Sequence, residues 1–364
     1  SYNYLINGSK PVIVKAPGLV APDFTWETVT QMDFGFDASF LNNRLTGTFD
    51  WYRRNTKDML VAGSTLPATL GASVPKSNSA DMKTIGWELS LGWNDRLENG
   101  FSYWVKGVLS DYQATITKYA GNDAGFYSQS DGDGKYYVGQ KIGEIWGYHS
   151  NGLFQSDDEA ATIDQSELYA GKWGAGDVKY EDLDNDGKIT KGEETIYNPG
   201  DKSIIGNKTP RYQFGITVGF DYKNFDFEMF WQGTGKRDYM LSGAQFWGFT
   251  SQWDVPYTPA LDYWTETNTD AYFPRPGWQN GGNRVTSDRY LQSAAYGRLK
   301  NLTVGYTIPK NLTTKWGISR LRLYVTGENL LTITPLNDAF DPETLGGMTY
   351  PINRKVAIGL NLTL

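Results

Sequence analysis

The sequence predicts an all-β fold: a transmembrane antiparallel β-barrel with long extracellular loops and short periplasmic turns, to which this chain contributes about nine strands. Three observations predict it. Apolar and polar residues alternate with a period of two over long segments, short and long connections follow one another along the chain, and aromatic residues make up 15% of a sequence with 41 glycines. Strands of soluble sheets have about five or six residues, whereas a tilted strand needs about nine to eleven to cross a bilayer.

The expected strands are identified by this alternation. Segment 211–222 (RYQFGITVGFDY) alternates throughout, with apolar residues on one face and polar or small residues on the other. Segment 101–112 is the weakest, because Trp104 and Val108 interrupt its pattern. In chain order, the expected strands are 31–41, 44–52, 85–94, 101–112, 211–222, 225–232, 300–308, 319–327 and 352–364.

The connections between these strands differ systematically in length. The short ones are Asn42–Asn43, 95–100, Lys223–Asn224 and about 309–318. The long ones are about 61–84, 113–210, 239–294 and 334–350. Tight periplasmic turns and long external loops are typical of outer-membrane barrels. A soluble β-sandwich or barrel is the alternative, and it has no reason for such asymmetry.

The number of strands bears on closure. An odd number of antiparallel strands that begins in an external loop leaves two open edges, whose backbone groups lipid cannot satisfy. We therefore expect the C-terminal part of a larger barrel, with the missing strands on another chain or a removed N-terminal segment. Residues 1–28 are expected to form an extracellular loop leading into the barrel. Residues 29–364 form the C-terminal barrel part, with large extracellular loops at about 113–210 and 239–294.

The composition of the chain argues against several classes of partner and site. Cysteine is absent, and the net charge of −7 argues against nucleic acid as the partner. No apolar run of about 18 residues exists to form a transmembrane helix. The first residues show no signal peptide and no initiator Met, so we expect a mature chain or a fragment. The single histidine, His149, supports neither a catalytic triad nor a multi-histidine metal site, and we expect it to pack a loop.

One stretch, 182–193 (DLDNDGKITKGE), has the spacing of an EF-hand calcium loop but lacks helical flanks. Gly187 stands at the turn position of such a loop. The alternative interpretation is an Asp/Asn/Gly turn that holds no ion. The hypothesis is a Ca²⁺ site inside the external excursion 113–210. Its expected ligands are the carboxylates of Asp182, Asp184 and Asp186, the backbone carbonyl of Lys188, and a bidentate Glu193.

Aromatic and acidic residues give further candidates. Loop tryptophans stack on sugar rings or pack their own loops, and those considered are Trp173, Trp247, Trp253 and Trp278. Tryptophans on apolar strand faces are expected to contact lipid or form an interfacial girdle, and these are Trp51, Trp87, Trp93 and Trp231. Polar residues on the lumen side are expected to contact substrate or to form part of a solvated lumen wall. These residues are Asp33, Asp37, Glu88, Asp226 and Glu228.

Several long segments carry a family resemblance. They are 22–60, 143–156 (GEIWGYHSNGLFQS), 175–190 (AGDVKYEDLDNDGKIT), 205–233, 296–309 (YGRLKNLTVGYTIP) and 321–334 (LRLYVTGENLLTIT). In this order they resemble the barrel of SusC/RagA-type TonB-dependent transporters. The resemblance implies a barrel of 22 strands with an N-terminal plug and a TonB box, of which this chain supplies the last nine strands and no plug. The family usually ends on an aromatic residue, whereas this chain ends on Leu364.

The resemblance also implies a function. Such transporters lie in the outer membrane of Gram-negative bacteria and import oligosaccharides, or in some cases oligopeptides, under a SusD-like surface lipoprotein. TonB, engaged through the missing N-terminal part, supplies the energy, and no enzymatic activity is expected. The expected partners are therefore the lipoprotein, TonB, the N-terminal barrel and plug portion, the transported molecule and outer-membrane lipid. The alternatives are a TonB-dependent receptor for an iron chelate (siderophore) or cobalamin, and a passive porin.

Overall fold

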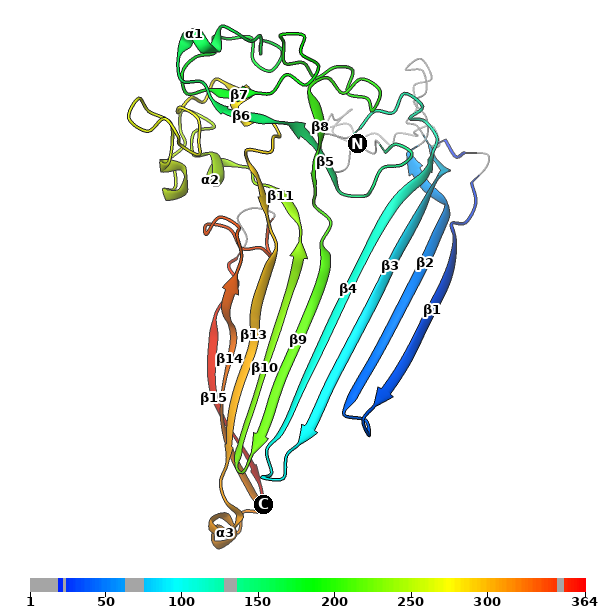
Figure 1. Cartoon of the computed structure of the whole chain (residues 1–364), viewed down its shortest axis with the longest axis vertical. Helices are drawn as coiled ribbons and strands as arrows, with labels where there is room; N and C mark the ends of the chain where they lie inside the picture. The colour runs from blue at the N-terminus through cyan, green and yellow to red at the C-terminus, as the bar shows by residue number, and fades with distance from the viewer. Residues whose placement is uncertain (1–18, 22–23, 63–74, 128–135, 346–349) are drawn as a thin grey trace, which may run out of the picture.

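The computed structural model describes residues 19–21, 24–62, 75–127, 136–345 and 350–364. The nine expected strands are present and form one sheet (Figure 1). Its strands are β1 (Thr28–Phe40), β2 (Leu45–Ala62), β3 (Lys76–Arg96), β4 (Ser102–Tyr119), β9 (Arg211–Tyr222), β10 (Phe225–Lys236), β13 (Tyr296–Thr307), β14 (Arg320–Ile333) and β15 (Lys355–Thr363).

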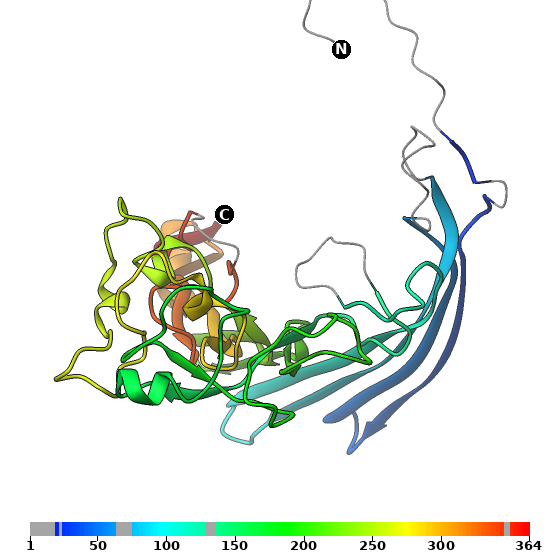
Figure 2. The ribbon, with the colours of Figure 1, turned by 90° about the horizontal axis from the view of Figure 1, so that it is seen from above.

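Each strand of this sheet pairs antiparallel with the next one, in the order β1-β2-β3-β4-β9-β10-β13-β14-β15. The sheet curves like part of a cylinder wall, as the view from above shows (Figure 2). It does not close: within the described residues, β1 pairs with β2 alone and β15 with β14 alone. The prediction of an antiparallel barrel part with two open edges is confirmed.

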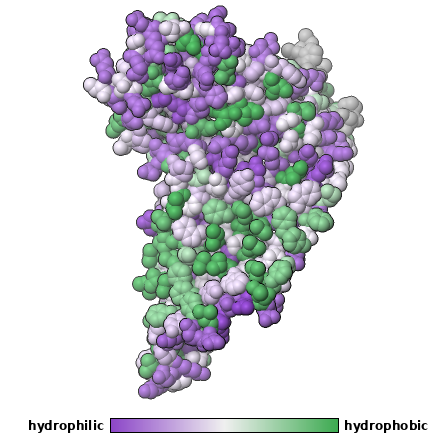
Figure 3. Space-filling view, viewed as in Figure 1, coloured by the Kyte–Doolittle hydropathy of each residue, from purple (hydrophilic) through white to green (hydrophobic). Residues whose placement is uncertain are grey.

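Register places the alternating apolar residues on one common face of the sheet. Phe34 lies opposite Trp51, which lies opposite Trp87, and farther along the sheet Val105 lies opposite Val218. Because every second side chain shares a face, these pairs extend into an apolar band across the strands (Figure 3). We call this the apolar face, and the opposite one the lumen face.

Trp104 and Val108, which interrupt the sequence pattern of β4, lie on the lumen face. Trp104 is paired with Gly219 and Val108 with Gly215. A Cβ atom added to Gly219 would lie 2.1 Å from the Trp104 ring, so glycine makes room for the indole on the neighbouring strand. The alternation of β4 is therefore intact in three dimensions. Large lumen side chains cover glycines of adjacent strands.

The strands β2, β3 and β4 continue well beyond the alternating segments. The prediction of a loop over about 61–84 is wrong in extent, since β3 already begins at Lys76. Beside Trp87 on the apolar face lies Asp111, which is buried and forms an ion pair with Arg211. A paired charge at this level marks the outer edge of the apolar band. Beyond it, water and loops cover the strands, so a two-residue pattern is no longer required.

The short turns lie at the end of the sheet that also carries the C-terminus (Figure 1). Residues 41–44 join β1 to β2, and Leu41, Asn42 and Asn43 have φ values of 56°, 57° and 66°. Asparagine tolerates this left-handed region better than most residues, which suits a tight hairpin. The longest of the four, between β13 and β14, holds α3 (Lys310–Thr313) and η4 (Thr314–Trp316).

The long connections at the other end form a folded cap, which we define as the described residues between β4 and β9, β10 and β13, and β14 and β15. Its elements are β5 (Glu144–Tyr148), β6 (Ser150–Leu153), α1 (Asp157–Ala160), β7 (Val178–Tyr180), β8 (Lys202–Asn207), β11 (Asp238–Met240), α2 (Ala244–Trp247), η2 (Thr258–Leu261), η3 (Gly281–Arg284) and β12 (Leu291–Ser293). The helices found among the described residues are all too short or too polar to cross a membrane.

The cap has one hydrophobic core that all three connections share. Tyr180 comes from the first connection, Phe246 and Tyr290 from the second, and Leu336 from the third. Each is at most 2% exposed, and the Phe246 and Tyr290 rings meet edge to face with centroids 6.1 Å apart. Removing one such ring from a packed core costs about 3–5 kcal/mol, so the three excursions fold together rather than as separate loops.

A buried charge cluster ties the third connection to the sheet. Arg298 of β13 is 2% exposed and donates to Asp341 at 2.5 Å and Glu343 at 2.8 Å. Lys300 adds a second contact to Glu343 at 2.9 Å. Because an unpaired buried arginine would be very costly, these carboxylates hold the connection against β13.

Candidate functional site

The acidic stretch expected to bind calcium lies in the cap as a tight turn. Asp182 accepts hydrogen bonds from the backbone N–H groups of Asn185 (2.7 Å) and Gly187 (2.7 Å). Asp184 accepts one from the N–H of Asp186 at 3.1 Å. Asn185 and Gly187 have φ values of 62° and 84°, which lets the chain fold back over the two carboxylates.

A third carboxylate reaches the same place from farther along the chain. Asp201 is completely buried and accepts hydrogen bonds from the N–H groups of Leu183 and Thr190, each at 2.7 Å. Oxygen atoms of Asp182, Asp184 and Asp201 all lie within 4.8 Å of one another. Three convergent carboxylates are the kind of donor set that a hard cation such as Ca²⁺ prefers.

Two other predicted ligands, the carboxylates of Asp186 and Glu193, do not belong to this group of three. The Asp186 carboxylate accepts from the N–H of Lys188 at 2.8 Å instead. Glu193 is exposed, and its N–H donates to the carbonyl of Asn198 at 3.0 Å. In an EF-hand a following helix returns the twelfth residue to the ion. Here the chain runs into a turn, and the third carboxylate beside Asp182 and Asp184 comes from Asp201.

The electrostatics at Asp184 favour a positive charge nearby. Desolvation raises the pKa of the Asp184 carboxyl, and repulsion by Asp186 and Asp201 raises it further. A cation held between these carboxylates would relieve that repulsion, and its binding would displace the proton.

The four loop tryptophans differ in exposure. Trp247 is 9% exposed and belongs to the cap core, and Trp173 packs against that core while its Nε1 donates to the Tyr169 carbonyl at 3.0 Å. Trp253 and Trp278 are 83% and 48% exposed. Only this second pair remains as candidate platforms for a ligand or a partner.

The lumen face carries the predicted acidic residues beside basic ones. Asp226 forms an ion pair with Arg322 of β14, on the wall of an open cavity of about 620 Å³. Trp104, Glu228 and Arg320 also line it. Asp37 accepts a hydrogen bond from Thr48 at 2.7 Å. The wall is therefore polar and mixed in charge, as in a water-filled lumen.

The comparisons with known proteins agree with this architecture. The family model described as TonB dependent receptor-like, beta-barrel matches residues 1–330. The chain belongs to this family of TonB-dependent receptor β-barrels. Its nine strands correspond to a C-terminal part of the barrel. TonB-dependent receptor P3 of Formosa agariphila is 30% identical over an alignment of 380 positions, and the alignment covers 95% of this chain and 35% of that protein. TonB-dependent receptor SusC of Bacteroides thetaiotaomicron is 26% identical over 93% of this chain and 32% of its own length.

A structural likeness supports the same fold. The solved structure of the RagAB peptide transporter matches with a TM-score of 0.71 at 22% identity, over 94% of this chain and 36% of the other. The chain thus spans about a third of the length of each of these three proteins.

In this member of the TonB-dependent receptor family, the structure also joins residues that the sequence does not connect. His149 lies between Asp288 and Ser203: its Nδ1 is 2.8 Å from Asp288 Oδ2, and its Nε2 is 2.7 Å from Ser203 Oγ. The histidine thus contacts residues from two of the cap's connections. Ser203 lies inside the β5/β8 ladder opposite Gly147, where its backbone serves strand pairing. The contacts of His149 therefore link this ladder to Asp288, in the segment before β12.

Proposed function

We propose that the chain is part of an outer-membrane transporter that imports oligosaccharides with energy delivered through TonB, beneath a SusD-like lipoprotein. The observation that carries this proposal is the family match over residues 1–330, on a curved sheet whose one end bears a folded cap. The contact with TonB would be made by the N-terminal part of the transporter, and the chemistry would be binding and passage without bond cleavage.

The surface of the cap supports a partner or a sugar ligand. Trp253, Val255 and Tyr257, on the connection from β10 to β13, are 83%, 79% and 49% exposed. Grouped exposed aromatic residues mark interaction sites, and their rings fit the apolar faces of sugars. Oligopeptide import is the second candidate, favoured by the structural likeness to a protein described as a peptide transporter.

Uptake assays on the full-length transporter separate these functions. In cells expressing it with its lipoprotein, labelled oligosaccharide should accumulate, and loss of TonB should abolish accumulation. Uptake that survives loss of TonB would identify a passive porin. Accumulation of labelled peptide but not oligosaccharide would replace the first candidate with the second, and accumulation of an iron chelate or cobalamin alone would place the chain among receptors for those molecules.

A pair of tryptophan variants makes the test specific. Trp253→Ala, in the cap, should weaken oligosaccharide uptake about tenfold if its ring supplies a stacking or partner contact of about 1.4 kcal/mol. The matched control is Trp316→Ala, since Trp316 is 62% exposed but lies in the turn between β13 and β14 at the opposite end. Equal uptake by both variants would remove Trp253 from the site.

We propose further that the acidic turn binds Ca²⁺ and stiffens the cap, with Asp182, Asp184 and Asp201 as carboxylate ligands. Asp184→Asn, which removes one charge from an exposed side chain, should weaken Ca²⁺ binding about tenfold or more, because a hard cation needs charged oxygen ligands. The control Asp186→Asn should have the smaller effect. Calorimetry with the metal alone measures both. Ca²⁺ affinity should also fall as the pH drops through the acidic range in which Asp184 gains its proton.

If Asp186→Asn weakened Ca²⁺ binding more than Asp184→Asn, Asp186 would be a ligand, as the EF-hand spacing predicts. Identical weak binding by both variants and the parent would leave an Asp/Asn/Gly turn with no specific ion. Limited proteolysis with and without a chelator, read at the cap, then tests whether the metal stiffens it.

A further inference from the structure

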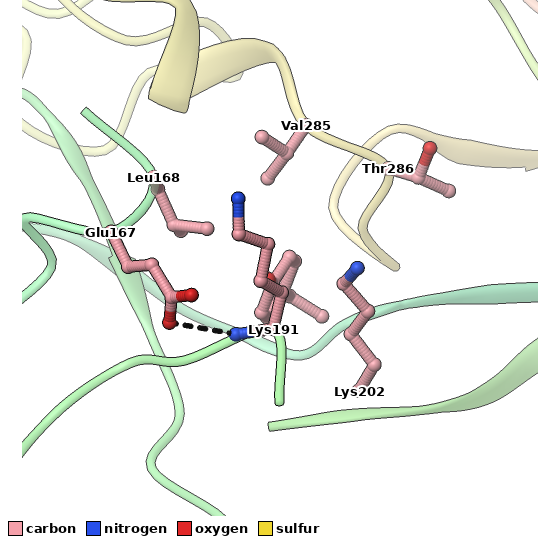
Figure 4. Close-up of a pocket in the computed structure, with 7 residues that line it drawn as sticks. Glu167, Leu168, Lys191, Lys202, Val285 and Thr286 are labelled. Carbon is pink, nitrogen blue, oxygen red and sulfur yellow. Dashed lines mark hydrogen bonds between the residues drawn. The ribbon is translucent and has the colours of Figure 1, made fainter. Parts of the chain in front are cut away.

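A cavity of about 200 Å³ lies in the cap, and neither the acidic turn's three carboxylates nor the exposed tryptophans line it. Two lysine side chains, Lys191 and Lys202, rise toward Val285 and Thr286 on its other side (Figure 4). Leu168, Glu167 and Tyr148 complete the lining. Segments from the β4–β9 and β10–β13 connections thus meet around one small space.

The ammonium groups of the two lysines differ in their ion pairs. Lys202 is 6% exposed, pairs with Glu194 at 3.2 Å, and lies 5.4 Å from the centre of the Tyr148 ring. Lys191 has an ion pair with none of the described residues. The Glu167 carboxylate accepts from the Lys191 backbone N–H at 3.0 Å and lies beside the same cavity. Lys191 is exposed, so water also reaches its ammonium group, and the Glu167 carboxylate shares the cavity wall with the two lysines.

The Tyr148 hydroxyl is a second unmatched group. Tyr148 is 2% exposed, and its oxygen has no hydrogen-bond partner among the described residues. Burial is the main cause that raises the pKa of this hydroxyl, so it stays protonated and is a donor. A buried donor without an acceptor costs about 1–3 kcal/mol, unless a ligand or water supplies the acceptor.

We infer that this cavity binds a carboxylate group, with Lys191 and Tyr148 as the donors and Lys202 as the second cationic wall. A carboxylate would place one negative charge beside two ammonium groups, of which Lys202 already pairs with Glu194. A dianion such as phosphate would meet the nearby carboxylates of Glu167 and Glu194. Leu168 and Val285 supply apolar surface for a short carbon chain next to the carboxylate. The volume admits one small acid or one end of a longer ligand.

This inference does not depend on what the barrel transports, and its failure would leave the transport proposal untouched. The carboxylate can come from a free short-chain acid or from the C-terminus of an oligopeptide. Both sources present the same carboxylate group to the cavity, and two arms of one experiment distinguish them.

The experiment uses the full-length transporter purified in detergent, with propionate as the probe and ligand-observed NMR titration as the readout. Propionate should bind, and the neutral isostere propionamide should not. Tyr148→Phe, which keeps the ring and removes one donor, should weaken propionate binding about tenfold, as should Lys191→Met. The control is Lys172→Met, because Lys172 is a surface lysine paired with Asp157 outside the cavity.

The peptide arm uses tetra-alanine with a free or an amidated C-terminus as the competitor of propionate. Displacement by the free form alone would assign the carboxylate to an oligopeptide end, and no displacement by either would assign it to a free acid. Equal binding of propionate and propionamide, or unchanged binding by both Tyr148→Phe and Lys191→Met, would overturn the inference. So would a structure in propionate that shows water alone on the Tyr148 hydroxyl.

Discussion

Residues 1–364 expressed alone should give no heat-resistant species on detergent electrophoresis, because the sheet has two open edges. β1 and β15 each expose one row of backbone N–H and C=O groups along thirteen and nine residues. Each such group left unsatisfied in lipid costs several kcal/mol, so the sum is of the order of tens of kcal/mol. The nine strands should therefore aggregate or remain protease-sensitive in detergent.

The same chain should assemble when the N-terminal portion of the transporter is supplied as a separate chain. External loop tips tolerate breaks, and the strands of the two chains can then pair at both edges. A heat-shifted, protease-resistant band should appear only on co-expression. If such a band formed from residues 1–364 alone, the open-edge interpretation would be wrong, and the sheet would have to close on itself or on a second copy.

Ile216→Arg should strongly impair assembly of the full transporter. Ile216 lies mid-strand in β9 on the apolar face, between Gly107 of β4 and Trp231 of β10, and is 40% exposed. An arginine on the lipid face near the bilayer midplane costs about 2–4 kcal/mol. The urea concentration at half unfolding in liposomes, or the folded fraction on a heat-shift gel, measures this loss.

The neighbouring Thr217→Arg is the matched control, since it places the same side chain on the lumen face. Thr217 lies opposite Lys106 and Phe230. Repulsion by Lys106 acts through a solvated face, where charges are screened, so we expect a cost below about 1 kcal/mol. Equal losses for both variants would contradict the assignment of the two faces.

The fold could be predicted largely because lipid imposes a two-residue period. Where a strand faces the bilayer on one side and water on the other, its residues alternate between apolar and polar. One such strand is β9, which occupies 211–222 as expected. The pattern fails where a glycine on the next strand lets a large side chain lie on the lumen face, as Gly219 does for Trp104. It also ends beyond the ion pair of Asp111 and Arg211, which is why the sequence predicts a loop where the outer part of β3 lies.

The cap sites could be predicted only in part, because their residues meet through tertiary folding. The spacing of Asp182 and Asp184 is local and marks the turn correctly. Asp201 joins them from beyond a second turn at Pro199 and Gly200, and no fixed spacing announces it. The contacts of His149 with Asp288, and of Lys191 with a cavity bounded by Val285, span two connections and leave no trace in sequence periodicity.

The outward extension of β2, β3 and β4 affects how strongly the charges of the lipid act on the cap. From the edge of the apolar band at Trp87, β3 continues about eleven residues to Lys76. At about 3.3 Å per residue and a tilt near 40°, this segment rises roughly 25–30 Å. The Debye length at physiological ionic strength is about 8 Å. Cap groups that lie at that height are several screening lengths from the edge of the apolar band, so the charge of the surrounding lipid should act on them only weakly.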